Sequence, residues 1–113
     1  MATYVLLDLV ATGSNITQTK FRDAINGCRK KQDYGYAPVF ISARHCVSPL
    51  DDASSTNTFE NCVNTNLGRD GGSLDGLTVV HEDDLNQYSA GVQGQIRALV
   101  QQIEAAGNTV EGF

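Results

Sequence analysis

The sequence predicts an α+β fold, a ferredoxin-like split βαβ sandwich with the order strand, helix, strand, insertion, strand, helix, strand. Two observations carry this prediction: short β-branched runs alternate with amphipathic segments, and a long polar stretch separates the two strongest helical stripes. The composition, 41% hydrophobic and 19% charged residues, is that of a folded chain. The alternative is a small three-layer α/β fold with parallel strands, in which a helix of the polar stretch forms a crossover.

The first strand is predicted at 3–11, because aliphatic and β-branched residues fill both of its faces. One face carries Val5, Leu7 and Leu9, and the other carries Tyr4, Leu6, Asp8 and Val10. A helix follows, with Thr17 as its N-cap and an apolar stripe of Phe21, Ala24, Ile25 and Cys28. A second strand is expected at 39–43.

Residues 44–76 are polar and weakly periodic, which predicts a surface insertion containing one short helix. The apolar side of that helix carries Phe59, Cys62, Val63 and Leu67. A third strand is expected at 77–81, and Gly107 follows a last helix. The stripe of the last helix is Val92, Ile96, Leu99, Val100 and Ile103, which we expect to pack against Val5, Leu7 and Leu9. Residues 108–113 are the candidate fourth, edge strand.

The length of 113 residues indicates one domain over 1–113. Asp and Glu outnumber Lys and Arg by 13 to 8, giving a net charge of −5. Nucleic-acid binding requires clustered positive charge, and the only cluster, Arg29-Lys30-Lys31, is better explained as the cationic end of a helix. No apolar run is long enough to cross a bilayer. We therefore expect neither nucleic acid nor a membrane as a partner.

The number and spacing of the cysteines also limit the classes of protein to be considered. Cys28, Cys46 and Cys62 form an odd number with no close pair, unlike a secreted disulfide framework, so three free thiols are expected. No closely spaced Cys or His pair suggests zinc, so neither a metal nor a cofactor is expected. The start of the chain lacks the cationic region of a secretory signal, which favours a cytoplasmic protein, or a virion component.

Two short motifs were candidates for chemistry. Thr12-Gly13-Ser14-Asn15 lies where phosphate-binding loops occur, but it lacks their glycine patterns and is more typical of a turn and cap. His45 and Cys46 pair a base with a nucleophile, yet neighbours on an extended chain point to opposite faces. Cys46 and His81 are a geometrically possible pair, although a buried free cysteine is the commoner case.

Asp8 is the least expected residue, because it places a carboxylate within an aliphatic strand. A buried carboxylate needs hydrogen-bonded partners and often marks a functional site. The equally favoured interpretation is an Asp near a strand end, on a sheet face open to water or to a partner.

The split plan places both helices on one face of the sheet and leaves an apolar patch on the other. That patch consists of Tyr4, Leu6, Asp8, Val10 and Phe40. The sequence therefore predicts a non-enzymatic assembly or structural module that acts through a protein–protein interface, as a homo-oligomer or as a subunit of a larger assembly. Its small, Asn-, Gln-, Ser-, Thr- and Gly-rich character suggests a virus-borne structural or accessory protein.

The alternative hypothesis is a small enzyme or ligand-binding domain with a pocket formed by Asp8, Tyr36, His45 and His81. The fold class does not decide between the two, because such folds carry many unrelated activities. A convergent site that contains Asp8 and an imidazole would favour the alternative, and a flat, shared sheet face would favour assembly.

Overall fold

The computed structural model describes residues 3–12, 16–28, 38–50, 55–69 and 73–113. The elements, in chain order, are β1 (Thr3–Thr12), α1 (Gln18–Cys28), β2 (Val39–Phe40), β3 (His45–Leu50), α2 (Thr56–Arg69), β4 (Ser73–Val80), the 3-10 helix η1 (Glu82–Gln87), α3 (Ala90–Ala105) and β5 (Thr109–Val110). The Arg29-Lys30-Lys31 cluster, most of the Thr12–Asn15 motif and Tyr36 lie outside the described residues.

The strands form one mixed sheet in the order β2-β3-β1-β4, with β5 also pairing with β1. The β2–β3, β3–β1 and β1–β4 pairs are antiparallel, and only the β1–β5 pair is parallel. β4 pairs with β1 from Leu6 to Thr12, while β5 pairs with Thr3 and Tyr4. The register places Asp8 of β1 directly opposite both His45 of β3 and Thr78 of β4.

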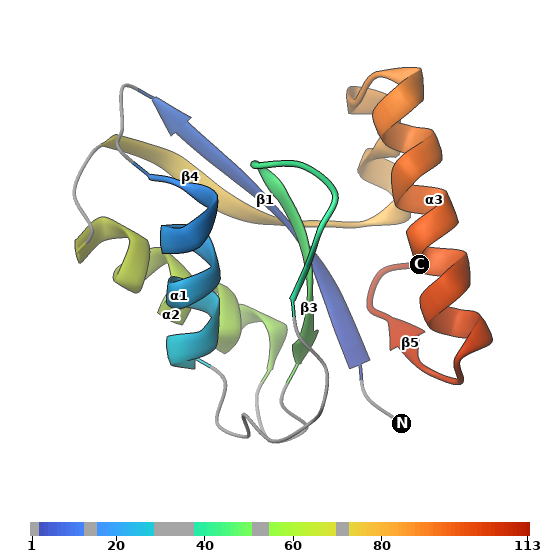
Figure 1. Ribbon diagram of the computed structural model, residues 1–113, viewed down its shortest axis with the longest axis horizontal. Coiled ribbons are helices and arrows are strands. Elements are labelled where there is room, and N and C mark those ends of the chain that lie inside the picture. Colours follow the sequence, from blue (N-terminus) through green and yellow to red (C-terminus); the bar gives the residue numbers. More distant parts are fainter. Residues whose placement is uncertain (1–2, 13–15, 29–37, 51–54, 70–72) are drawn as a thin grey trace.

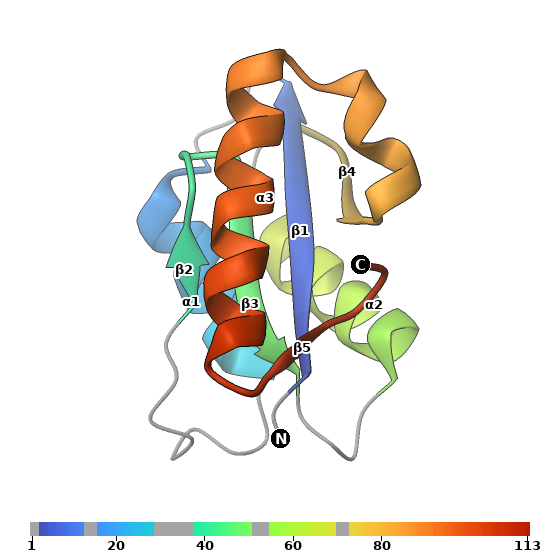
Figure 2. The same cartoon turned by 90° about the vertical axis from the view of Figure 1, so that its right-hand side faces the viewer.

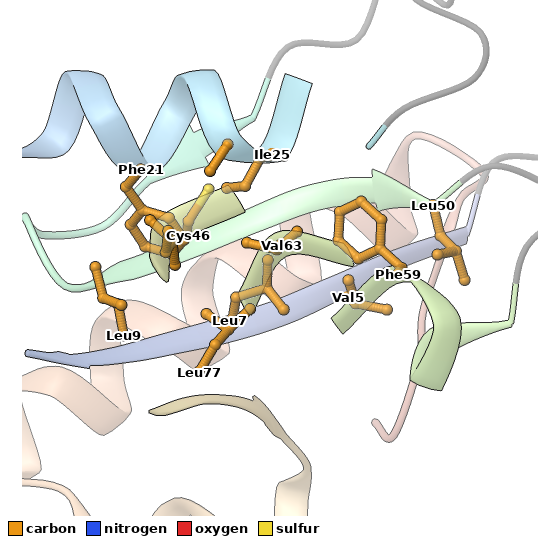
Figure 3. Packing of buried hydrophobic residues seen from close by; sticks show 12 residues of the cluster. Val5, Leu7, Leu9, Phe21, Ile25, Cys46, Leu50, Phe59, Val63 and Leu77 are labelled. Atoms are coloured by element: carbon orange, nitrogen blue, oxygen red, sulfur yellow. The ribbon is translucent and has the colours of Figure 1, made fainter. Parts of the chain in front are cut away.

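Helices cover both faces of this sheet, with α1 and α2 on one side and α3 on the other (Figures 1 and 2). The side chains of Val5, Leu7 and Leu9 point toward α1 and α2 and form a core with Phe21, Ile25, Phe59, Val63 and Leu67 (Figure 3). Tyr4 and Leu6 point the other way and form a second core with Val47, Val80, Leu85, Ile96, Val100, Ile103 and Val110. Successive side chains of β1 point to opposite faces of the sheet, and both sets are mainly apolar. The strand therefore contributes to two cores, one on each face.

The predicted α+β class is confirmed at this level. The antiparallel order β2-β3-β1-β4 is the one that the split βαβ plan requires, but the helices that share one face are α1 and α2, not the first and last helices as predicted. α2 comes from the predicted insertion, and α3 covers the opposite face (Figure 1). The stripe of α3 is buried as predicted, but its partners are Tyr4 and Leu6, so the predicted contact with Val5, Leu7 and Leu9 is wrong. The three-layer alternative is right about helices on both faces and wrong about parallel strands.

Residues 44–76 are not the polar surface insertion that their composition suggests. They contain β3, whose six residues from His45 to Leu50 are all buried next to β1, and α2, which packs Phe59, Val63 and Leu67 into the first core. The error arises because β3 includes Ser48 and Pro49, which weaken its apolar pattern. Pro49 lies beyond the short β2–β3 pairing, which involves only Cys46 and Val47 of β3.

Local capping follows the sequence closely. The Thr17 hydroxyl accepts a hydrogen bond from the Lys20 backbone N–H at the start of α1. α3 ends before Gly107, which adopts a positive φ of 89° and donates its N–H to the Glu104 carbonyl. Gly112 is required sterically, because it has a φ of 88° and a β-carbon there would lie 1.9 Å from His81 Nδ1.

The expectation of three free thiols is wrong, because Cys28 of α1 and Cys62 of α2 form a disulfide. The two residues are separated by 34 positions in the sequence, and packing of α1 against α2 brings them together. Cys46 is free and fully buried. Within the described ranges, no helix has the length and apolar character needed to span a membrane.

Candidate functional site

A polar row crosses the sheet on the side that α3 covers, at the level where η1 meets α3. His45, Asp8 and Thr78 stand side by side on β3, β1 and β4, and their side chains share one face because directly opposed residues of antiparallel strands do so. Asp8 and His45 are buried, whereas Thr78 is exposed. The alternation of β1 places Asp8 on the same face as Tyr4 and Leu6 but beyond them along the strand.

The Asp8 carboxylate accepts hydrogen bonds from two side chains that are distant in the sequence. Arg44 binds both oxygens, with Nε donating to Oδ1 and Nη2 donating to Oδ2 at 2.9 Å. The Tyr88 hydroxyl donates to Oδ2 at 2.7 Å. Asp8 is only 4% exposed while Arg44 is 52% exposed, so the ion pair spans the boundary between the interior and solvent.

These partners keep Asp8 ionised. Burial by itself raises the pKa of the Asp8 carboxyl, but hydrogen bonds from Arg44 and Tyr88 outweigh burial and hold the pKa below its usual 3.8. Burial and the hydrogen bond to Asp8 raise the pKa of Tyr88, so its hydroxyl remains a donor. The carboxylate therefore carries a full negative charge next to the imidazole of His45.

His45 is oriented by Ser42, which lies in the turn between β2 and β3. The Ser42 hydroxyl oxygen accepts the backbone N–H groups of Arg44 at 3.2 Å and of His45 at 3.1 Å. Its own hydrogen is thereby directed to His45 Nδ1, 2.9 Å away. The neutral imidazole then carries its proton on Nε2, which faces Asp8 Oδ1 at 3.5 Å.

The Nε2 atom of His45 is buried without a hydrogen-bond partner among the described residues. The imidazole also packs edge-to-face against the Tyr88 ring, with centroids 5.3 Å apart. Burial lowers the pKa of His45 below its usual 6.5; the charge of Asp8 opposes this shift and that of Arg44 adds to it. His45 is therefore a neutral base at pH 7.

A hollow of about 230 Å³ lies beside the cluster, with Tyr88 and Thr78 in its wall. It is lined by Thr78, Val79, Val80, Asp84, Gln87 and Tyr88. Asp84 also accepts the backbone N–H of His81 at 3.2 Å. Within the described part of the chain, no three His, Cys, Asp or Glu side chains are grouped to hold a metal ion.

The structure brings together two of the four residues of the predicted alternative pocket, Asp8 and His45. His81 is exposed against Gly112 and is not among the described partners of Asp8. Tyr36 falls outside the described residues. Ser42, Arg44 and Tyr88 were missed; Ser42 and Arg44 flank His45 closely enough in sequence to be considered, but nothing local points to Tyr88.

The predicted interface residues are arranged differently from the expectation. Tyr4, Leu6 and Asp8 are buried beneath α3 and η1, so the predicted open sheet face does not exist in the chain. Phe40 belongs to the opposite side, where its ring meets that of Phe21 edge-to-face at 5.6 Å. Only Val10 remains half-buried on the predicted patch.

Cys46 shares no site with an imidazole. It points into the core between the sheet and α1 and α2 (Figure 3). Because neighbours on a strand point to opposite faces, His45 points the other way. Burial raises the pKa of the Cys46 thiol to about 12, so it is a poor nucleophile at neutral pH. The expectation that His45 does not serve Cys46 agrees with this geometry.

A second feature, which we name the α3 face, is the outward side of α3. Its exposed uncharged residues are Ala90, Gly91, Gly94, Gln95, Ala98, Gln101, Gln102 and Ala105. The two charged residues of the helix, Arg97 and Glu104, lie along one border, and Arg97 approaches Glu82 at 3.5 Å. A β-carbon at Gly91 or Gly94 would meet nothing within 4 Å.

Comparison of the chain with models of protein families, with curated proteins and with solved structures finds no match.

Proposed function

We propose that the protein is an assembly module that binds a second copy of itself through the α3 face. The observation that carries the proposal is the pair of exposed glycines Gly91 and Gly94, where a β-carbon would meet no described atom within 4 Å. Glycine in a helix interior is about 1 kcal/mol less favourable than alanine. A site with open space around it gains nothing from glycine within the monomer.

Contact with a partner helix explains why glycine is found at these two positions. Small side chains at helical spacing let two helix backbones approach closely, because no side chain holds them apart. Gly91, Gly94, Ala98 and Ala105 form the centre of the face, and glutamines flank it. Amide side chains of Gln101 and Gln102 can donate and accept hydrogen bonds across such a contact.

The charge distribution favours a second copy as the partner. Each chain carries a net charge of −5, so two copies repel one another over most of their surfaces. The centre of the α3 face has no charged residue, and depletion of charge is typical of the core of a protein interface. The centre of the face therefore brings no like charges together when two copies meet there.

This proposal retains the assembly function expected from the sequence but assigns it to a different surface. The sheet face that first suggested it is covered by α3, whereas α3 itself presents an uncharged outer face. A virus-borne structural role is part of the proposal and rests on composition. The Cys28–Cys62 disulfide supports a virion or another oxidising location over a reducing cytoplasm, because disulfides persist in the former.

Sedimentation of charge variants at Ala98 tests the proposal. Ala98→Glu and Ala98→Arg should each sediment as monomers under conditions where the wild type associates, because each places like charges in the contact. An equimolar mixture of the two should associate again. Asn61→Glu adds the same charge at an exposed position of α2 and serves as the matched control.

The result that would overturn the proposal is equally specific. A wild-type chain that stays monomeric over the whole accessible concentration range contradicts it. So does association that Ala98→Glu and Asn61→Glu leave equally unchanged.

A further inference from the structure

We propose that Ser42, His45 and Asp8 form a hydrolytic relay that acts on small carboxylic esters, with Ser42 as nucleophile, His45 as general base and Asp8 as positioning residue. This inference concerns the β2–β3 turn and does not depend on the α3 face. Its evidence is the connectivity of the three side chains.

The connectivity is that of an activated serine. The Ser42 hydroxyl lies 2.9 Å from Nδ1 of His45, and the other ring nitrogen lies 3.5 Å from Asp8 Oδ1. A serine nucleophile requires a hydroxyl within hydrogen-bond reach of a base and a carboxylate beside that base, whatever the chain order of the three residues. Here Ser42 is within hydrogen-bond reach of His45, and Asp8 lies beside the other ring nitrogen without a hydrogen bond to it. Ser42 is exposed, so a substrate can reach it.

A purely structural role leaves one feature of the cluster unexplained. Asp8 is already satisfied by Arg44 and Tyr88, and the turn is closed by the Ser42 oxygen with two amides. The His45 side chain is 8% exposed, yet its Nε2 atom has no hydrogen-bond partner among the described residues. A buried donor without a partner is unfavourable by about 1–3 kcal/mol. A positive charge on His45 strengthens the attraction between Nε2–H and Asp8.

The reaction balances with water as the only co-reactant. The Ser42 oxygen forms a bond to the ester carbonyl carbon as its proton passes to Nδ1, and the carbonyl electron pair moves to oxygen. Collapse breaks the bond to the alcohol, which leaves with the proton from Nδ1. Water then attacks the acyl-serine by the same proton transfers, releasing a carboxylic acid and free Ser42.

Two groups of the same turn assist charge development. The amides of Arg44 and His45 donate hydrogen bonds to the Ser42 oxygen and so favour loss of its proton to His45. Arg44 uses two of its five N–H donors on Asp8 and is half-exposed, so the rest are available to an oxyanion or an acidic substrate. Ser42 is exposed on a turn, so the carbonyl of a small ester can reach it without entering a cavity.

A fluorophosphonate probe tests the proposal directly, because serine attack on phosphorus expels fluoride and leaves a stable adduct. We expect a single adduct on Ser42, identified by peptide mass analysis, and none in Ser42→Ala. Ser55→Ala is the matched control: Ser55 is also exposed and its oxygen accepts the Thr58 backbone N–H at 3.1 Å, but its side chain bonds to Thr58, with no imidazole in its recorded contacts. This variant should label like the wild type.

The roles of the base and the carboxylate need separate readouts. His45→Gln should slow labelling by about 100-fold or more, the usual contribution of a general base. In the wild type the rate should rise as His45 loses its proton, and Asp8→Asn should move that rise to lower pH. Should Asp8→Asn fail to fold, the Ser42 and His45 variants still decide.

Labelling of folded wild type at another residue, or none at all, overturns the proposal. Equal labelling rates in wild type and in folded His45→Gln overturn it as well.

Discussion

The two faces of the sheet hold their helices by different means. On the α1/α2 side, a dry apolar core is joined by a disulfide between the two helices. On the α3 side, an apolar core gives way at one end to the charged and hydrogen-bonded cluster around Asp8. One strand, β1, therefore contributes to two different kinds of core. The polar cluster around Asp8 is confined to the part of the second core where α3 begins.

The largest expected effect is on the α1/α2 side. Phe21 is fully buried between α1 and the sheet, so Phe21→Ala should lower the free energy of unfolding by about 3–5 kcal/mol. Urea denaturation followed by circular dichroism measures this loss. Leu99→Ala, at a half-buried position on the α3 side, should cost less, and the reverse order would contradict the assignment of the cores.

Reduction of the disulfide should come next. Opening the Cys28–Cys62 link frees a loop of 34 residues in the unfolded chain and should cost about 2–4 kcal/mol. Urea unfolding with and without a reductant measures the difference. Cys46→Ala serves as a control whose response to reductant should equal that of the wild type, and an unchanged midpoint in both proteins would mean that the link is absent.

The contribution of the α3 side to stability should depend on pH. Burial lowers the pKa of His45 below 6.5, so the unfolded chain binds a proton there more readily and stability should fall as pH drops below about 6.5. The pKa of Asp8 is also below its usual 3.8, so its contribution is present above that pH and is lost on further acidification. His45→Gln should flatten the first slope in urea midpoints measured across pH. A wild-type stability that is independent of pH between 6.5 and 4 would contradict this.

The smallest effect should be a gain in stability. Gly94→Ala should raise the stability of the monomer by about 0.4–1 kcal/mol, because alanine reduces the freedom of the unfolded chain and meets no atom within 4 Å. The same change should weaken self-association in sedimentation. Gly112→Ala is the contrasting case and should destabilise the protein, since it combines a positive φ with a clash against His81. Thermal unfolding at low protein concentration separates these outcomes.

Most of the helices were predictable from the sequence, whereas β3 and the disulfide were not. The stripe from Phe21 to Cys28 and the stripe from Val92 to Ile103 predict α1 and α3 because each repeats at the helical period. β3 was missed because Ser48 and Pro49 resemble loop residues, although pairing with β1 buries them. Tertiary pairing overrides such local preferences.

The candidate site was predictable in part. Asp8 stood out as a carboxylate in an apolar strand, and His45 as an imidazole near a strand start. Their contact depends on the antiparallel β1–β3 register, which a sequence pattern does not specify. Tyr88, 80 residues from Asp8 in the chain, was beyond any local signal.

The sequence by itself determined that β1 is buried on both sides from Tyr4 to Leu9, because its two sets of alternating side chains are both mainly apolar. It also determined which side of each helix is buried. Only the tertiary structure decided which helix covers which face, since the apolar stripes of α1 and α3 fit either core equally well by composition. Strand pairing around β1 and the two cores place α1 and α2 on one face and α3 on the other. That placement turns Asp8 from an expected interface residue into the centre of a buried polar cluster.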